Sequence, residues 1–189
     1  MSYRFRRKKN LKAIIEFVLL VMIVSSLIFV LRKVQLSKSK PLKKIIYNEE
    51  VVEFRNDLRK AKEIPVYPND EAIREILFSN STKEITIAFK PAENNSIYAI
   101  EAFEITYKLL RYVYPSYGFL PKFRGINVSS YDGLEGSKAN PLIILIHPIY
   151  SNETSVRVED YKIFISGVTE EEFDLATIRF LMAAMDIKI

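Results

Sequence analysis

The run Leu142-Ile143-Ile144-Leu145-Ile146 decides the fold class of this chain. Its five residues are all apolar, with no alternation between apolar and polar positions. A short uninterrupted run of this kind is typical of a strand that is covered on both faces, as in the middle of an α/β sheet. The sequence therefore predicts a central strand over residues 142–146.

Other strands and helices are expected on both sides of this run. Residues 84–90 alternate strictly, with Ile85, Ile87 and Phe89 on one side, which indicates a strand. The remaining predicted strands are residues 126–129 and a hairpin formed by residues 155–158 and 161–166. Helices are predicted over residues 48–62, 70–78, 94–114 and 169–187. This order is typical of the α/β class, with a small mixed sheet and helices packed on it.

The distribution of apolar residues predicts how three of these helices are buried. In residues 48–62 the stripe consists of Val51, Phe54, Leu58 and Ala61. In residues 94–114 the expected inner face consists of Ile97, Ile100, Phe103, Tyr107 and Leu110, and Glu104 and Lys108 form a pair on the outside. The last helix begins after Thr169 as its cap and is apolar almost all round, so we expect it to be buried.

A much longer apolar segment lies near the N-terminus, from Ala13 to Leu31, where only Glu16, Ser25 and Ser26 are polar. Nineteen residues make about 28 Å of helix, which is close to the thickness of a bilayer hydrocarbon core. We therefore predict one transmembrane helix over residues 13–33, preceded by a basic tail over residues 1–12 and followed by a stalk over residues 34–47. Residues 48–189 then form the folded domain.

Charge is distributed unevenly along the chain. Residues 1–44 hold 12 Lys and Arg and one acidic residue, whereas residues 45–189 hold 16 Lys and Arg and 22 Asp and Glu. Basic residues beside an apolar segment are explained by lipid headgroups and by membrane insertion. A nucleic-acid-binding domain would carry its positive charge on the folded part, so we expect membrane lipid and no nucleic acid among the partners.

The orientation in the membrane is predicted from a second pattern. Six basic residues precede the apolar segment and six follow it, so the positive-inside rule does not decide. The sequence Asn-x-Ser/Thr begins at Asn80, Asn94, Asn127 and Asn152, all after the segment. These are possible N-glycosylation sites, and they favour a cytoplasmic N-terminus with the domain outside the cell.

Residue usage excludes several classes of site. The chain has no cysteine and one histidine, His147, so disulfides, thiolate metal sites, cysteine nucleophiles and multi-histidine metal sites are all excluded. The five glycines are not spaced as in a phosphate-binding or dinucleotide-binding loop. We expect no metal and no cofactor. Abundant Lys, Glu and Ile with a single Gln is the composition of a hyperthermophile protein.

The candidate catalytic residues are Ser129, Ser130, Asp132 and His147, which follow predicted strands. Ligands of open α/β sheets gather at the carboxyl ends of strands, where Lys90 is also expected. A Ser–His–acid hydrolase is one interpretation of this set, although no Gly-x-Ser-x-Gly motif is present. In the other interpretation His147 caps a strand and forms local hydrogen bonds.

Two stretches resemble known groups of proteins. Residues 139–148, with Asn152-Glu153-Thr154 and the hairpin and helix that follow, resemble membrane-anchored proteins of hyperthermophilic archaea, which implies a cell-surface setting and assigns no site residues. Ala13-Ile14-Ile15-Glu16-Phe17 resembles the start of a type IV pilin, where a glutamate also lies early in the apolar helix. The pilin pattern has a small residue before its cleavage point, whereas this chain has Asn10-Leu11-Lys12.

Together these patterns predict a single-pass membrane-anchored protein with a non-catalytic exterior α/β domain. We expect that domain to bind a protein partner, to self-associate or to support a surface assembly. The alternatives are a membrane-anchored hydrolase that uses Ser129 or Ser130 with His147, and a pilin-like surface subunit.

Overall fold

The computed structural model describes residues 41–93 and 95–189, and Pro41–Ile189 form one compact unit. The predicted tail, the predicted transmembrane helix at residues 13–33 and the first part of the predicted stalk lie outside the described residues. Within the described ranges, no helix has the length and apolar character needed to cross a membrane. The architecture is mixed α/β, as the sequence predicts.

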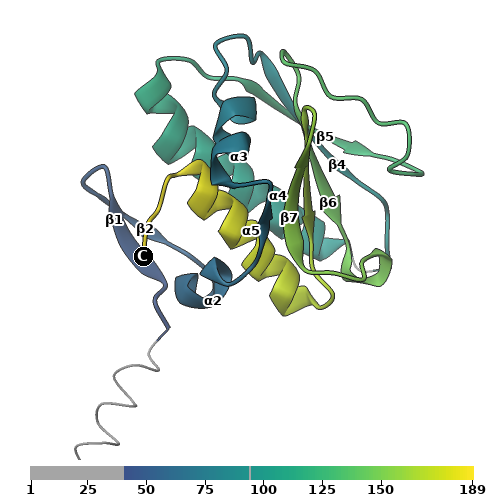
Figure 1. Cartoon of the computed structure of the whole chain (residues 1–189), viewed down its shortest axis with the longest axis horizontal. Coiled ribbons are helices and arrows are strands. Elements are labelled where there is room, and N and C mark those ends of the chain that lie inside the picture. Colours follow the sequence, from purple (N-terminus) through teal and green to yellow (C-terminus); the bar gives the residue numbers. More distant parts are fainter. Residues whose placement is uncertain (1–40, 94) are drawn as a thin grey trace, which may run out of the picture. The chain divides into compact units, whose positions relative to one another are not determined.

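A mixed sheet of six strands, in the order β3-β7-β8-β6-β4-β5, forms the centre of the unit (Figure 1). Strands β5, β4, β6 and β8 are mutually parallel, β7 is antiparallel to β8, and β3 is parallel to β7. The strands are β3 (Val66–Tyr67), β4 (Glu84–Phe89), β5 (Lys122–Asn127), β6 (Leu142–Ile146), β7 (Ser155–Glu159) and β8 (Lys162–Ser166). The predicted central strand and hairpin are confirmed, and β5 begins earlier than expected.

Strand β6 is covered on both faces, as its sequence predicts. Ile143 and Leu145 pack into the main core with the helices, whereas Leu142 and Ile144 belong to a second, smaller apolar cluster. The second cluster is closed by residues of the loop after β5, among them Tyr131 and Leu134. Successive side chains of a strand point to opposite faces, so an uninterrupted apolar run is what two apolar layers require.

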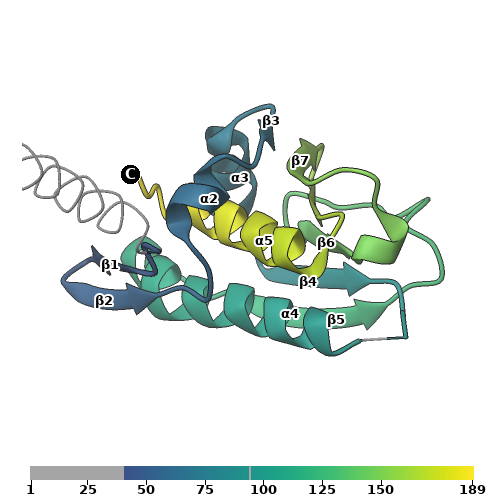
Figure 2. The same cartoon turned by 90° about the horizontal axis from the view of Figure 1, so that it is seen from below.

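The longer helices lie together on one side of the sheet, and the loop between β5 and β6 lies on the other (Figures 1 and 2). These helices are α3 (Asp70–Leu77), α4 (Ser96–Lys108) and α5 (Glu170–Ala184). Helix α4 continues into the π-helix η1 (Leu109–Val113) and the 3-10 helix η2 (Tyr114–Tyr117). A short 3-10 helix, η3 (Pro148–Tyr150), follows β6.

Helix α5 is the centre of the helical layer. Its N-terminus is capped by Thr169, whose hydroxyl accepts a hydrogen bond from the Glu172 N–H at 3.2 Å. All but one of the residues from Phe173 to Met185 are buried, the exception being Arg179. The predicted cap and the predicted burial of this helix are both confirmed.

The predicted helix over residues 48–62 is wrong for most of its length. Residues Lys44–Tyr47 (β1) and Glu50–Glu53 (β2) form an antiparallel hairpin, and only Leu58–Lys62 (α2) are helical. Asn48 and Glu49 have φ values of 48° and 67°, which is the backbone of a two-residue hairpin turn. Strand β1 also lies in the segment predicted to be a stalk.

Gly167 provides a test of the close packing between β8 and α5. A Cβ atom at this position would lie 2.3 Å from the Phe173 nitrogen and 2.5 Å from its Cα, whereas a Cβ at Gly125 would meet nothing within 4 Å. We expect Gly167→Ala to destabilise the unit by about 2–3 kcal/mol, or roughly 5–10 °C in Tm. Gly125→Ala is the control, with an expected change within about 0.5 kcal/mol. Equal melting temperatures for the two variants would contradict this packing.

Candidate functional site

The carboxyl ends of the parallel strands bring together three residues that the sequence analysis singled out. Lys90, Ser130 and Asp132 line a hollow of about 300 Å³, together with Tyr131 and Tyr150. The Lys90 ammonium lies 4.4 Å from the centre of the Tyr150 ring. The expectation that these loops meet at one edge of the sheet is therefore met for this group.

The predicted pairing of a serine with His147 is not formed. The Ser130 hydroxyl donates to Asp132 Oδ2 at 3.0 Å, and the Asp132 N–H donates back to Ser130 Oγ at 3.1 Å. His147 Nδ1 accepts from the Ile149 N–H at 3.3 Å, and its buried Nε2 has no partner among the described residues. Ser129 is exposed in the loop after β5. His147 thus forms local hydrogen bonds, as in the second interpretation of its position.

Tyrosines that the sequence analysis did not consider tie these strand ends together. The His147 N–H donates to the Tyr98 hydroxyl at 3.1 Å. The Tyr131 hydroxyl donates to the Leu145 carbonyl at 2.9 Å and accepts from the Lys90 N–H at 3.2 Å. Since these bonds satisfy main-chain groups at the ends of β4 and β6, they account for both tyrosines as structural residues.

Three of the four possible glycosylation sites are exposed, namely Asn80, Asn127 and Asn152. Asn94 lies outside the described residues. Exposure is a requirement for modification and not evidence of it, so glycosylation stays a prediction.

Helix α4 is rotated relative to the sequence prediction, and this is the most informative feature of the unit. Of the expected inner face, Ile100, Phe103 and Tyr107 are exposed, with 41%, 64% and 45% of their surface accessible. Ile97 is buried as predicted, but the rest of the buried face consists of Tyr98, Glu101, Ile105 and Lys108, two of which are charged. The prediction that Glu104 and Lys108 pair is confirmed, but the pair does not lie outside.

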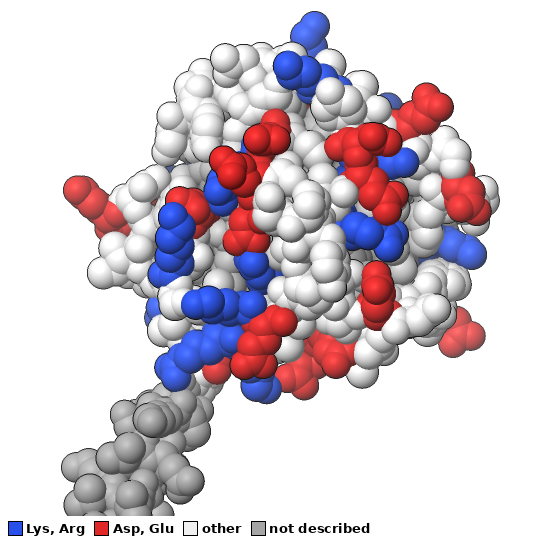
Figure 3. All heavy atoms as spheres, viewed as in Figure 1, with Lys and Arg blue, Asp and Glu red and all other residues white. Residues whose placement is uncertain are grey.

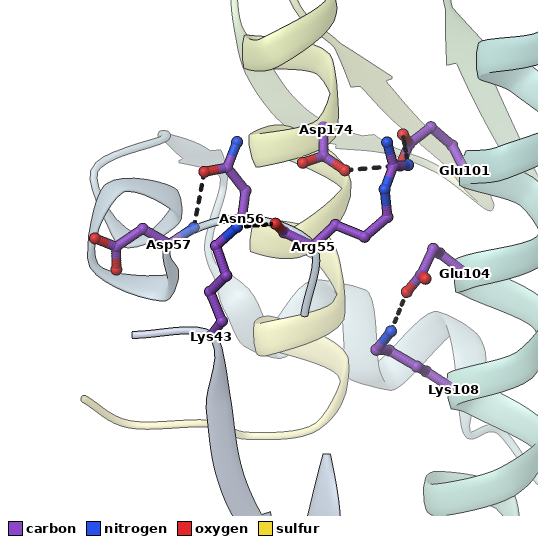
Figure 4. Close-up of polar contacts among 8 residues, drawn as sticks. All are labelled: Lys43, Arg55, Asn56, Asp57, Glu101, Glu104, Lys108 and Asp174. Atoms are coloured by element: carbon purple, nitrogen blue, oxygen red, sulfur yellow. Dashed lines mark hydrogen bonds and ion pairs between the residues drawn. The ribbon is translucent and has the colours of Figure 1, made fainter. Parts of the chain in front are cut away.

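A cluster of charged residues lies beneath α4 and explains this rotation (Figure 4). The Nη1 atom of Arg55 lies 3.0 Å from Glu101 Oε1 and 3.4 Å from Asp174 Oδ1, so a single guanidinium joins α4 to α5. The Glu101 side chain is only 1% exposed, and that of Asp174 is 11% exposed. Because a buried carboxylate needs a partner, Arg55 fixes the face of α4 that turns inward.

About two helical turns after Glu101, Lys108 makes a second inward polar contact. Its ammonium donates to Glu104 Oε2, as the close-up in Figure 4 shows, and lies 5.0 Å from the centre of the Phe54 ring. The Lys108 side chain is only 4% exposed. Arg55 and its neighbour Phe54 thus supply an ion-pair partner for Glu101 and an aromatic partner for Lys108.

The electrostatics of the cluster favour protonation of one carboxyl. The pKa of Glu101 is raised from 4.5 to about 7, because burial and the negative charge of Asp174 outweigh the opposing effect of Arg55. Burial also raises the pKa of Asp174, again opposed by Arg55. Two carboxyl groups that share one guanidinium cannot both be ionised without cost.

A hollow of about 350 Å³ lies beside this cluster and is bordered by four acidic residues, Glu101, Glu170, Glu171 and Asp174. Within residues 41–93 and 95–189, no three His, Cys, Asp or Glu residues are arranged to hold a metal ion. The ion pairs that join Arg55 to Glu101 and Asp174 make the cluster a structural support of α4.

The opposite side of α4 is an uncharged surface that we call the α4 outer face. It consists of residues of α4 and one residue of η1, all exposed or half-buried, namely Ala99, Ile100, Ala102, Phe103, Thr106, Tyr107 and, in η1, Leu110. Ile100 lies at its edge and also borders the hollow beside the cluster. The Phe103 and Tyr107 rings stack at 5.7 Å with an interplanar angle of 10°, and Tyr112 meets Tyr107 edge-on at 6.0 Å. By contrast, acidic and basic side chains lie side by side over the face of the molecule shown in Figure 3.

Comparison with known proteins returns no match to a family model, a curated protein or a solved structure. The function is therefore argued from the geometry above.

The raised pKa of Glu101 predicts how stability depends on pH. The folded state holds this proton up to about pH 7, whereas the unfolded chain releases it near its ordinary pKa. The favourable contribution is thus complete below pH 4.5 and is lost as the pH rises through 7. We expect unfolding free energy to fall by on the order of 2–3 kcal/mol between pH 5 and pH 8 through this group.

The matched variant is Glu101→Gln, which keeps the shape of the side chain and cannot ionise. Chemical denaturation at several pH values should give a flatter profile for Glu101→Gln than for the natural chain, with the larger difference at pH 8. Parallel profiles for the two proteins would show that Glu101 is not the titrating group.

Proposed function

We propose that this chain is a single-pass membrane-anchored protein whose folded domain, residues 41–189, stands outside the cytoplasm and binds a protein partner through the α4 outer face. The proposal is for a non-catalytic role in recognition or assembly at a membrane surface.

The sequence supports the anchor. The apolar segment at residues 13–31 has the length of a membrane helix and is bounded by basic residues on both sides. The four Asn-x-Ser/Thr sequences, all after this segment, favour the exterior placement of the domain, and the asparagines of three of them have the exposure that modification requires.

The α4 outer face is the single observation that carries the binding role. The cores of protein–protein interfaces are enriched in aromatic residues and depleted of charged ones. Phe103 is 64% exposed in the middle of a face that carries no charged side chain of its own. The cost of leaving such a ring in water is removed when another apolar surface covers it.

The strand-end residues support a non-catalytic role for the domain. The Ser130 hydroxyl is held by Asp132, and the imidazole of His147 accepts a main-chain N–H rather than a serine proton. A nucleophilic serine requires a base within hydrogen-bond reach.

Membrane anchoring is tested by alkaline extraction and by protease treatment of intact spheroplasts. The full chain with a C-terminal tag should stay in the membrane fraction at high pH, and the tag should be removed by protease added from outside. Release of the full chain into the supernatant would contradict the anchor, and a protected tag would contradict the orientation.

The binding role is tested by placing a photo-reactive amino acid at Phe103 or, as a control, at Leu120, which is 68% exposed but lies outside α4. Irradiation of membranes that contain the full chain should give a discrete cross-linked protein product from position 103 and none from position 120. Absence of a product at position 103, or equal products at both positions, would contradict binding through the α4 outer face.

A further inference from the structure

The spacing of residues on the α4 outer face matches one particular kind of partner. Ile100, Phe103 and Tyr107 of α4 and Leu110 at the start of η1 are separated by three, four and three residues, which is the spacing of the apolar seam between two paired helices. A seam of this width is narrower than the stripe with which a helix packs on a sheet. The outer face is therefore shaped for another helix.

We propose that this helix is α4 of a second copy of the same chain, packed antiparallel about a two-fold axis. The inference rests on the proposed function, since it names the partner that the outer face takes.

The seam is complementary to itself in this arrangement. In an antiparallel pair Phe103 of each copy meets Tyr107 of the other, and Ile100 of each copy meets Leu110 of the other. Each contact therefore occurs twice, as a two-fold interface requires. Ala99, Ala102 and Thr106 flank the seam with small side chains, which allows the two helix backbones to approach closely.

The charges of α4 also favour a copy of itself over a charged partner. Glu101 and Lys108 are buried, Glu104 is paired with Lys108, and Arg111 is paired with Glu50 at 3.0 Å. Two copies can then meet on the seam without opposing like charges, even though residues 45–189 carry excess acid.

The small size of the seam means that the membrane anchor contributes to the pairing. A helix of 13 residues is only about 20 Å long, so one such seam buries less than the ~800 Å² per partner of a standard interface. It is weak between molecules that diffuse freely. An anchor confines copies to one plane and raises their effective concentration, and another copy is a partner that the same anchor brings to the same membrane.

The test is energy transfer between full-length chains in liposomes. The chain has no cysteine, so Lys138→Cys, in an exposed loop outside α4, gives one labelling position for donor and acceptor dyes. We expect transfer above the level of random proximity, and unlabelled chain should reduce it. Phe103→Asp should reduce transfer to the random level, whereas the control Leu120→Asp should leave it unchanged. Circular dichroism checks that both variants are folded.

Three outcomes would overturn the proposal, namely transfer at the random level for the natural chain, transfer that survives Phe103→Asp, or equal loss in both variants. Flotation of the same liposomes separates these outcomes from a failure of the proposed function. Chains that do not float with the lipid contradict the anchor itself. Chains that float but remain monomers, while position 103 cross-links to a different protein, contradict self-pairing and leave the binding role in place.

Discussion

The ion pairs of Arg55 with Glu101 and Asp174 are the constraint on which the rest of this structure depends. They join the segment after β2 to the two longest helices, at a place where the carboxylates have almost no access to water. Removing the guanidinium would leave two buried carboxyls with no opposite charge between them. Helix α4 must therefore turn Glu101 inward, and its rotation about its own axis follows.

The orientation of the apolar residues of α4 is a consequence of this constraint. With Glu101 and Lys108 inside, the seam of Ile100, Phe103 and Tyr107 has no place in the core and faces solvent. Helix α4 thus places Glu101 and Lys108 in the interior and Phe103 and Tyr107 on the surface, the reverse of what burial energies favour for these residue types in a monomer. The free-energy cost of exposing the α4 outer face to water is removed when a second surface covers it. This links the buried cluster to the proposed association.

Strands β4, β6, β7 and β8 could be predicted from sequence because their signals are local, whereas β3, the start of β5 and the strand order could not. The apolar run at residues 142–146, the alternation at residues 84–89 and the Thr169 cap each depend on neighbours in the chain. The β1–β2 hairpin had such a signal in Asn48-Glu49 between pairs of β-branched residues, but the helical spacing of Val51, Phe54 and Leu58 competed with it. The sequence around α4 carries no local signal of which face of the helix is buried. Glu101 is buried because it pairs with Arg55, which lies 46 residues away in the chain. The strand-end hydrogen bonds of Tyr98 and Tyr131 likewise depend on distant main-chain groups.

The orientation of α4 is tested most directly by hydroxyl-radical footprinting of the natural chain, diluted until it is monomeric in detergent. Phe103 and Tyr107 on α4 provide the exposed positions, and Tyr98 and Tyr114, which are 1% and 0% exposed, provide the buried ones. We predict rapid oxidation of Phe103 and Tyr107 and strong protection of Tyr98 and Tyr114. Protection of Phe103 and Tyr107 to the level of Tyr98 in the monomer would mean that the apolar seam faces the core, and would contradict the account.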